Sequence, residues 1–491
     1  MANLTKLRTQ HTTFTYSSYD WQLTNQNTLH ISFLYTIDPD ITFTPSLTIS
    51  SVTQELIDRL GSEVIDAYVF QIGLAELFSY WKTTAAAKIV IAAGVLEPTA
   101  AAFWHKLLLK GMGEFFYQNT IDFSDPNFVT ITSQSNEIHQ KISRDINTHT
   151  TQNIVASIHH PKPTILIPMG GGKDSATTLE ILKKEYTVGT LVISAPQSAQ
   201  DIIKIAEIPQ ERRHTVTRVL DPKLFELNAA GYLNGHVPIS AYLAFVSLLT
   251  ADLFEYSHVA ISNERSSNEG NVWYCDQEIN HQYSKTYEFE HDLHEYVAEF
   301  LPAQTPEYFS FLRPLYELQI AAIFSQFPQY HTVFKSCNRG QKENTWCGNC
   351  SKCLFAWTIL FPFLGPEKLT AFFGKNLYTD LNLWKTTQEL LGLKTTKPFD
   401  CVGTHEETTV AFYLAVQHYK KHAQPLPILL EKVAQELENN QKLTTGPDGQ
   451  SNFSDRVTTL ISDWNSQHYI PEELAALLQK SLQDSKVTGA L

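Results

Sequence analysis

Two patterns of hydrophobic and polar residues divide the first part of the chain. From Phe14 to Trp21, and again from Leu29 to Ile37, aromatic and β-branched residues alternate with polar ones. Alternation with a period of two predicts strands of a small sheet that has one buried face. From Val52 to about Tyr117 the apolar residues recur at helical spacing, which predicts helices. We therefore expect an N-terminal α+β domain over residues 1–150.

Residues 151–365 carry a different pattern, in which short apolar runs alternate with amphipathic runs. Strands are predicted at 164–168, 188–193, 214–219 and 258–263, and helices at 175–185, 198–207 and 240–255. Such alternation is typical of an α/β fold with a doubly wound parallel sheet, whose ligands bind at the carboxyl ends of the strands. Residues 366–491 are predicted to form a helical C-terminal region, with the polar segment 438–452 as a loop.

The composition narrows the class of protein. Of the 491 residues, 43% are hydrophobic and 18% are charged, which is ordinary for a globular enzyme with more than one domain. The net charge of −14 argues against a nucleic-acid partner, because proteins that bind nucleic acids are more often basic. The first residues lack the charge order of a signal peptide, and no apolar run reaches transmembrane length. We expect a cytoplasmic protein without membrane insertion.

The most informative motif is Ile-Pro-Met-Gly-Gly-Gly-Lys-Asp-Ser, residues 167–175. It joins a predicted strand to a predicted helix, where glycines let backbone N–H groups approach an anion and the helix dipole favours negative charge. The run resembles the Ser-Gly-Gly-x-Asp-Ser loop of the PP-loop ATP pyrophosphatases, with glycine in place of the first serine. That resemblance implies cleavage of ATP to AMP and diphosphate, with Asp174 placing Mg²⁺ as a catalytic residue. The alternative is a plain glycine-rich turn. The candidate ATP-binding residues are Gly170, Gly171, Gly172, Lys173, Asp174 and Ser175.

Further polar residues lie near the ends of predicted strands. Ser194 follows one strand and His236 precedes a helix, so both are candidate nucleotide contacts. The segment 263–285 is dense in hydrogen-bonding and titratable groups, which favours a substrate-binding segment over a solvated surface loop. Within it, Arg265 could clamp a carboxylate or phosphate, and Lys285 could stabilise charge in the transition state. The candidate substrate-binding residues are Asn263, Glu264, Arg265, Asn268 and Glu269.

Four of the six cysteines are crowded into one C-x9-C-x2-C-x2-C pattern. Two short C-x2-C steps place three thiolates within reach of one metal ion, and the more distant cysteine completes a tetrahedron. Four soft ligands with no open position predict structural Zn²⁺, with an iron–sulfur cluster as the alternative. A similar cysteine cluster follows the nucleotide domain of the PP-loop synthetase of the 7-deazaguanine pathway. We therefore expect residues 151–365 to form a PP-loop domain with a metal knuckle. The predicted ligands are Cys337, Cys347, Cys350 and Cys353.

Several motifs together resemble one family more closely. They are Gly-Met-Gly-Glu-Phe-Phe-Tyr-Gln-Asn (111–119), the glycine loop, Asn-Glu-Arg-Ser-Ser-Asn-Glu-Gly-Asn (263–271), Glu-Ile-Asn-His-Gln-Tyr-Ser-Lys (278–285) and Asp-Cys-Val-Gly-Thr-His-Glu-Glu (400–407). With them the chain resembles the ATP-dependent UDP-N-acetylmuramoyl-L-alanyl-L-glutamate epimerases of peptidoglycan synthesis. The resemblance implies that ATP activates the terminal L-glutamate of a nucleotide-linked dipeptide as an acyl-adenylate, and that its configuration inverts to D-glutamate. The alternatives are a PP-loop enzyme acting on tRNA or a deazapurine, and a non-catalytic nucleotide-sensing module.

The resemblance assigns no catalytic base. Inversion through a planar intermediate needs proton donors and acceptors on both faces of the carbon, or one mobile group. Cofactor-independent amino-acid racemases commonly use two cysteines, and the chain has two outside the cluster, Cys275 and Cys401. A histidine base, His281 or His405, is a second possibility, because the ordinary histidine pKa lies near neutral pH. The simplest alternative is that both cysteines are merely small buried residues.

Overall fold

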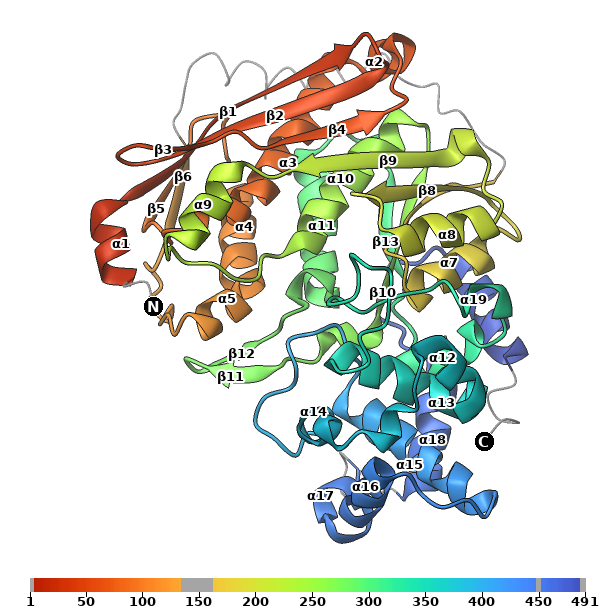
Figure 1. The fold of residues 1–491 in the computed structure, drawn as a ribbon. Helices are drawn as coiled ribbons and strands as arrows, with labels where there is room; N and C mark the ends of the chain where they lie inside the picture. Colours follow the sequence, from red (N-terminus) through yellow and green to blue (C-terminus); the bar gives the residue numbers. More distant parts are fainter. Residues whose placement is uncertain (1–3, 134–161, 447–451, 486–491) are drawn as a thin grey trace.

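The computed structural model describes residues 4–133, 162–446 and 452–485, and its centre is one mixed 11-stranded sheet (Figure 1). The strand order is β13-β10-β7-β8-β9-β4-β2-β1-β5-β6, and β3 pairs with β2. The strands of this sheet are β1 (Thr13–Thr24), β2 (Thr28–Ile37), β3 (Ile41–Phe43), β4 (Ser46–Ser50), β5 (Lys88–Ile91), β6 (Thr130–Ser133), β7 (Thr164–Pro168), β8 (Thr187–Ile193), β9 (Arg213–Val219), β10 (His258–Glu264) and β13 (Glu307–Leu312). A separate hairpin pairs β11 (Val272–Tyr274) with β12 (Gln277–Ile279).

Helices cover the sheet and form the C-terminal region. They are α1 (Leu4–Gln10), α2 (Gln54–Leu60), α3 (Ser62–Trp81), α4 (Pro98–Gly111), α5 (Gly113–Gln118), α7 (Lys173–Leu182), α8 (Gln197–Ile205), α9 (Pro222–Ala229), α10 (Ile239–Leu253), α11 (Tyr287–Phe300), α12 (Glu317–Phe324), α13 (Ser351–Phe373), α14 (Trp384–Leu390), α15 (His405–Lys421), α16 (Ile428–Asn439), α17 (Gln441–Thr444), α18 (Phe453–Ser462) and α19 (Glu472–Asp484). No helix in these described ranges is long and apolar enough to cross a membrane.

The parallel half of the sheet confirms the predicted α/β fold. Strands β7, β8, β9 and β10 and helices α7, α8 and α10 begin within two residues of the positions predicted from the sequence. The pairs β7–β8, β8–β9, β10–β7 and β10–β13 are all parallel. Their carboxyl ends therefore meet at one edge of the sheet, where ligands of such folds bind.

The N-terminal strands extend this same sheet. Strand β4 pairs antiparallel with β9, in a register that sets Ser46 opposite Val219, and β2 and β1 follow as predicted. Burial alternates strictly along β2, as the alternating sequence requires. The predicted helical run from Val52 to Tyr117 is wrong at one place, because β5 interrupts it. The β-branched residues of β5 are buried between β1 and β6, so sheet pairing outweighs helical spacing there.

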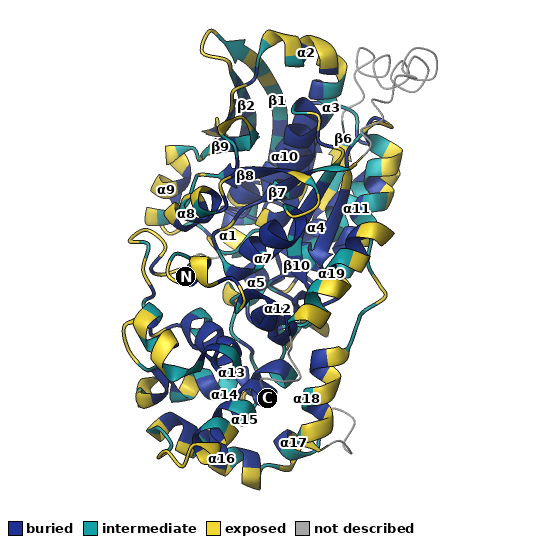
Figure 2. Cartoon of the chain, turned by 90° about the vertical axis from the view of Figure 1, so that its right-hand side faces the viewer, coloured by how far each residue is buried: buried dark blue, intermediate teal, exposed yellow. Residues whose placement is uncertain are grey.

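The sheet separates two hydrophobic cores. Leu166 on β7 belongs to the core that contains α3 and α10, whereas its neighbours Ile165 and Ile167 belong to the core with α7 and α12. This division follows from the period of two in a strand that is covered on both faces. Figure 2 shows that β7, β10 and α10 are largely buried, while the outer sides of peripheral helices are exposed.

The C-terminal region is helical, as predicted. Helices α14 to α18 gather at the end of the molecule opposite β1 and β2, whereas α19 packs against α7 and α12 (Figure 1). The segment expected to be a loop, 438–452, is partly helical, because α16 continues to Asn439 and the short helix α17 follows. Asn440 caps α17 with its side chain, which accounts for a helical turn in a polar stretch. Residues 447–451 of that segment, and the domain boundary expected near residue 150, lie outside the described residues.

Candidate functional site

A pocket of about 510 Å³ lies at the carboxyl ends of β7, β8 and β10. Of the residues predicted from the sequence, its wall includes Gly170, Gly172, Lys173, Asp174, Ser175, Ser194, Asn263, Glu264, Lys285, Cys337 and Cys401. Other polar residues of the wall, which sequence reasoning did not single out, are Arg218, Ser240, Tyr242, Ser262, Glu317, Lys335, Ser336, Asn338, Gln341 and Lys352. The pocket thus draws on the glycine loop, the polar segment, the cysteine cluster and the loop before α15.

The glycine loop has the local geometry of an anion site. Strand β7 ends at Pro168 and α7 begins at Lys173, with Gly172 at the N-cap and no side-chain cap bond. Gly171 has φ +84°, and a Cβ atom there would lie 2.1 Å from Oγ of Ser198, so only glycine fits. The first backbone N–H groups of α7 therefore have no side-chain acceptor at the cap, as in helices that receive an anion.

Lys173 lies between two carboxylates. Its Nζ atom is 2.5 Å from Oδ1 of Asp174 and also pairs with Oε2 of Glu317, the first residue of α12. Burial by itself would lower the pKa of Lys173, but Asp174 and Glu317 raise it, so this lysine stays charged. Burial raises the pKa of Glu317 well above its ordinary range, against the attraction of Lys173. Glu317 belongs to no recognisable sequence motif. The one feature that could have pointed to it is its position, a carboxylate just before the apolar run Ile320 to Phe324.

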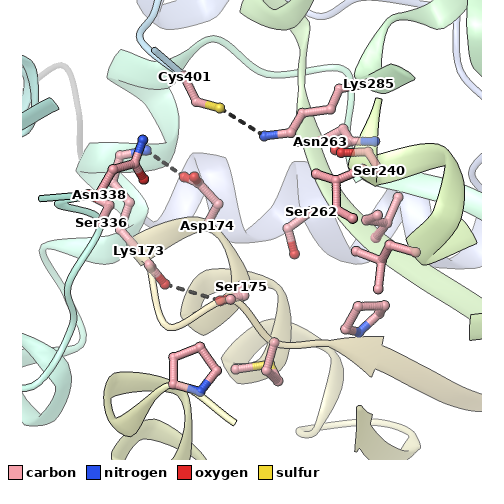
Figure 3. Close-up of a pocket in the computed structure, with 18 of the residues that line it drawn as sticks. Lys173, Asp174, Ser175, Ser240, Ser262, Asn263, Lys285, Ser336, Asn338 and Cys401 are labelled. Carbon is pink, nitrogen blue, oxygen red and sulfur yellow. Dashed lines mark hydrogen bonds and ion pairs between the residues drawn. The ribbon is translucent and has the colours of Figure 1, made fainter. Parts of the chain in front are cut away.

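Lys285 and Cys401 face each other across the pocket wall, 3.2 Å apart from Nζ to Sγ (Figure 3). Although burial opposes ionisation of the thiol, Lys285, Lys352 and His281 hold the pKa of Cys401 well below its usual value. Burial would lower the pKa of Lys285, but Cys401 and Glu264 raise it. Both effects favour the charged forms of the pair, a thiolate beside an ammonium.

Lys285 is held in place from behind by a buried ion pair. Arg313 is 0% and Glu290 is 1% exposed in their side chains, and they lie 3.0 Å apart. Arg313 also donates to the backbone carbonyl oxygen of Lys285, at 2.5 Å, and to that of Glu264, at 2.8 Å. One guanidinium therefore fixes the backbone of two residues that line the pocket.

His281 and His236 form a cluster with Glu114 beside the pocket. Nδ1 of His281 bonds Oε2 of Glu114, and the ring centroids of the two histidines are 4.4 Å apart. Burial lowers the pKa of His236 to about 3, with a further contribution from His281. We expected His236 to contact the nucleotide, but its side chain does not line the pocket. Glu114 was present in the motif at 111–119 without a role; a carboxylate among aromatic residues was the available signal.

The predicted substrate residues divide into two groups. Asn263 and Glu264 line the pocket. Arg265 instead pairs with Asp463 at 2.5 Å, and Glu269 pairs with Lys397 at 2.9 Å. The side chain of Asn268 bonds the backbone of its neighbours Arg265 and Tyr287. The polar segment therefore enters the pocket only at its two ends, 263–264 and 285.

Two of the candidate bases lie elsewhere. Cys275 sits in the turn between β11 and β12, where its neighbours are Asp122 and Tyr274, and it is absent from the pocket wall. His405 begins α15, and its Nδ1 atom lies 2.9 Å from the carbonyl oxygen of Leu390. The structure thus brings Cys401, His281 and Lys285 together and separates Cys275 and His405 from them.

The four clustered cysteines could hold one metal ion, since their sulfur atoms all lie within 4.8 Å of one another. The Sγ atoms of Cys337 and Cys350 are 3.8 Å apart, and those of Cys347 and Cys353 are 3.7 Å apart. A tetrahedron with metal–sulfur bonds of about 2.3 Å has edges of about 3.8 Å, so the donor set fits zinc. The backbone N–H of Lys335, just before the cluster, donates to the carbonyl oxygen of Gly171 at 2.9 Å. The cluster therefore supports the glycine loop directly.

Comparison with known proteins gives a consistent result along the chain. The family model described as MurL N-terminal domain matches residues 5–311, and the MurL C-terminal domain matches residues 333–445. Three curated relatives bear the name UDP-N-acetyl-alpha-D-muramoyl-L-alanyl-L-glutamate epimerase. The relative from Salinispora tropica is 32% identical over 82% of this chain and 84% of its own length. Those from Micromonospora sp. and Xanthomonas oryzae pv. oryzae are 34% and 33% identical, over 69% and 68% of this chain and 72% and 71% of their own lengths. No solved structure matches the chain.

Proposed function

Because the chain belongs to the MurL family of UDP-N-acetyl-alpha-D-muramoyl-L-alanyl-L-glutamate epimerases, we propose that it inverts the terminal L-glutamate of that nucleotide-linked dipeptide with the consumption of ATP. One observation carries the proposal: a single pocket holds both the glycine loop with Asp174 and the thiolate of Cys401. The glycine loop suits activation of the substrate carboxylate by ATP, and the thiolate suits abstraction of the Cα proton. The reaction is expected in the cytoplasm and supplies D-glutamate for peptidoglycan precursors.

The glycine loop is the proposed site of the triphosphate. The N-terminal N–H groups of α7 would bind the phosphates, and the side chain of Asp174 would hold Mg²⁺, which neutralises charge on the phosphate oxygens. Lys173 is anchored by Glu317 and keeps its positive charge beside the loop. The carboxylate oxygen of the substrate attacks the α-phosphorus atom, and the bond to the diphosphate leaving group breaks. The products of this step are the acyl-adenylate and diphosphate.

Activation makes the later proton transfer feasible. The proton on Cα beside a carboxylate is very weakly acidic, because the resulting carbanion would lie next to an anion. In the acyl-adenylate, the electron pair left on Cα delocalises into the carbonyl group, and closure to an oxazolone would acidify the proton further. The thiolate of Cys401 accepts the proton and becomes a thiol, while Lys285 stabilises the developing negative charge. A solvent proton then adds to the opposite face of Cα, and the thiol returns its proton to solvent. Finally, water hydrolyses the mixed anhydride, which frees the substrate carboxylate and releases AMP.

The cysteine cluster is proposed to bind one structural Zn²⁺, which joins the segment before α13 to the first turn of that helix. Its ligand Cys337 and its neighbour Lys335 line the pocket, and Lys335 bonds Gly171. The metal therefore supports the pocket wall without an open coordination position for chemistry.

The family membership disfavours the two alternatives raised by the glycine loop alone. A PP-loop enzyme of tRNA or deazapurine metabolism predicts binding of RNA or a purine-like acid. A nucleotide sensor predicts ATP binding without diphosphate release. A nucleotide sensor gives no reason for a thiolate at the pocket wall beside Lys285.

The test is a coupled measurement on the full chain with UDP-N-acetylmuramoyl-L-alanyl-L-glutamate, ATP and Mg²⁺ in D₂O. We expect one diphosphate released per activated substrate, deuterium at Cα and formation of D-glutamate on chiral analysis. No deuterium exchange is expected when ATP is replaced by an analogue that cannot be cleaved between its α and β phosphates. Exchange in the absence of any nucleotide would refute the activated-carboxylate route.

A further inference from the structure

His281 lies between Glu114 and the Cys401 loop, and Cys401 lines the pocket. Glu114 lies on α5, His281 follows β12, and Cys401 precedes α15. Oε2 of Glu114 bonds Nδ1 of His281. On the other side, the His281 ring lies against Phe399, two residues before Cys401, with ring centroids 6.5 Å apart. Since Nδ1 is engaged by Glu114, Nε2 is the ring nitrogen left for a second partner. Of the three side chains, only that of Cys401 lines the pocket.

Neighbouring groups fix the orientation of Glu114 and His281. The second oxygen of Glu114 accepts a bond of 2.6 Å from the side-chain amide of Gln118. The backbone N–H of His281 donates to Oδ1 of Asn271 at 2.7 Å, and its ring packs against His236. Glu114 is only 7% exposed. A buried carboxylate that is bound to a histidine is the arrangement that orients an imidazole for work on a neighbouring group.

We propose that Glu114 and His281 are positioning residues that keep Cys401 ionised, as the thiolate partner of an imidazolium. The inference rests on the proposed function, in which Cys401 accepts the Cα proton of the activated glutamate. Neither residue needs to touch the substrate. The negative charge of Glu114 stabilises the imidazolium, and the imidazolium stabilises the thiolate.

The electrostatics of the cluster agree with this geometry. Burial by itself would lower the pKa of His281, but its interactions with the nearby Cys401 and Glu114 raise it to about 9. The charged and titratable groups around Cys401 are Lys285 from the segment before α11, Lys352 from α13, Glu264 from β10, and His281. Those around His281 are Glu114, His236 and Cys401. Because the two lysines remain when Glu114 is changed, its loss should weaken ionisation of Cys401 without abolishing it.

The ionisation of Cys401 can be measured without substrate. The rate at which iodoacetamide alkylates Cys401 in the full chain is followed from pH 5 to pH 10 by mass spectrometry of its peptide. In the wild type we expect alkylation to persist into the acidic range. Glu114→Gln should move the half-maximal rate upward by at least about one pH unit, since the imidazolium loses its counter-charge. His281→Gln, a second variant, should move it in the same direction. Glu278→Gln on exposed β12 removes the same charge nearby and should leave the profile unchanged.

The outcomes separate this inference from the proposed function. A shifted alkylation profile without any epimerase activity would support the positioning role and refute the function. With substrate, Glu114→Gln should move the acidic limb of Cα exchange to higher pH and leave diphosphate release unaltered. A profile unchanged in both variants, or a wild-type Cys401 that fails to react at any pH, would overturn the inference. Glu114, His236 and His281 are also close enough to ligate a metal ion. A second metal ion per chain that is lost in Glu114→Gln would therefore overturn it too.

Discussion

The ammonium of Lys285 donates to the sulfur of Cys401 across 3.2 Å, although 116 positions separate them in the chain. The contact joins two motifs that looked independent in the sequence, the end of the polar segment and the loop before α15. It also changes the chemistry of both groups, because each stabilises the charged form of the other.

Removing the thiol should separate the two halves of the reaction. In Cys401→Ser we expect Cα exchange to fall at least about 100-fold, because a serine hydroxyl is a far weaker base at neutral pH, while diphosphate release persists. Cys275→Ser is the matched control, since that thiol lies outside the pocket. Exchange is measured by mass spectrometry in D₂O. A Cys401→Ser chain that exchanges at the wild-type rate would exclude the thiol base.

Asp174 should be needed for activation but not for folding. Its side chain is 31% exposed, so Asp174→Ala leaves no large cavity. We expect loss of AMP formation by at least about 100-fold, because Mg²⁺ would lack its protein ligand. Asp484→Ala, an exposed aspartate on α19, serves as the control. Diphosphate release and the melting temperature are measured together. Normal turnover in Asp174→Ala would contradict the assignment of the glycine loop.

Metal removal should affect stability as well as activity. The segment of the cysteine cluster holds the glycine loop through Lys335 and the Cys401 loop through Asn338, which donates to Asp400 at 3.0 Å. We expect Cys350→Ser, or a strong chelator, to lower the unfolding free energy by several kcal/mol and to abolish both half-reactions. Elemental analysis should find one zinc per wild-type chain. A stable, metal-free protein, or iron with sulfide, would contradict this prediction.

His214 should make the fold sensitive to acid. Its ring is buried, stacks on Phe254 with centroids 4.0 Å apart, and bonds the hydroxyl of Tyr256 at 2.9 Å. Burial lowers the pKa of His214 from 6.5 to about 4. Below pH 6.5 His214 is therefore protonated in the unfolded chain but stays neutral in the folded chain. The free energy of unfolding falls as the pH drops, until about pH 4. The loss is about 3 kcal/mol. Urea unfolding at pH 7 and pH 4.5 should show a smaller loss in His214→Gln; equal losses would refute the prediction.

The ion pair behind Lys285 should be sensitive to single substitutions. In Arg313→Met, Glu290 would remain buried without its partner, and we expect a loss of about 3–5 kcal/mol in unfolding free energy. The double variant Arg313→Met, Glu290→Gln should recover part of the stability, because the buried charge is gone. Epimerisation should stay impaired in both, since the carbonyl groups of Lys285 and Glu264 lose their donor. Denaturant titration checks the first outcome, and chiral analysis of glutamate checks the second.

The sequence predicted the parts of the fold that depend on local patterns. Strands β7 to β10 are short apolar runs next to amphipathic helices, and their boundaries were found within two residues. Strand β5 was missed because four residues inside a long helical pattern leave too little periodicity, and its pairing partners β1 and β6 are distant in sequence. Local pattern likewise cannot show that β4 pairs with β9 and joins the N-terminal strands to the parallel ones.

The same distinction applies to the candidate site. Asp174, Lys285 and Cys401 could be named because each stands in a motif with reactive side chains, and the pocket brings them together. Arg265 looked like the strongest anion contact, but its guanidinium pairs with Asp463 from a segment almost two hundred residues later. Glu114 was overlooked for the complementary reason. Its proposed role depends on contact with His281, 167 positions away, and no local pattern encodes that contact.

The long separations within the site have a consequence for synthesis of the protein. The glycine loop is translated long before its partner Glu317, which follows Lys173 by 144 positions. Cys401 likewise follows Lys285 by 116 positions. Contacts of this length form late, after much of the chain has left the ribosome. A nascent or interrupted chain that ends before α12 has neither the carboxylate that anchors Lys173 nor the thiolate. In the proposed mechanism such a fragment brings no base to an activated substrate, so unfinished copies would not carry out the inversion.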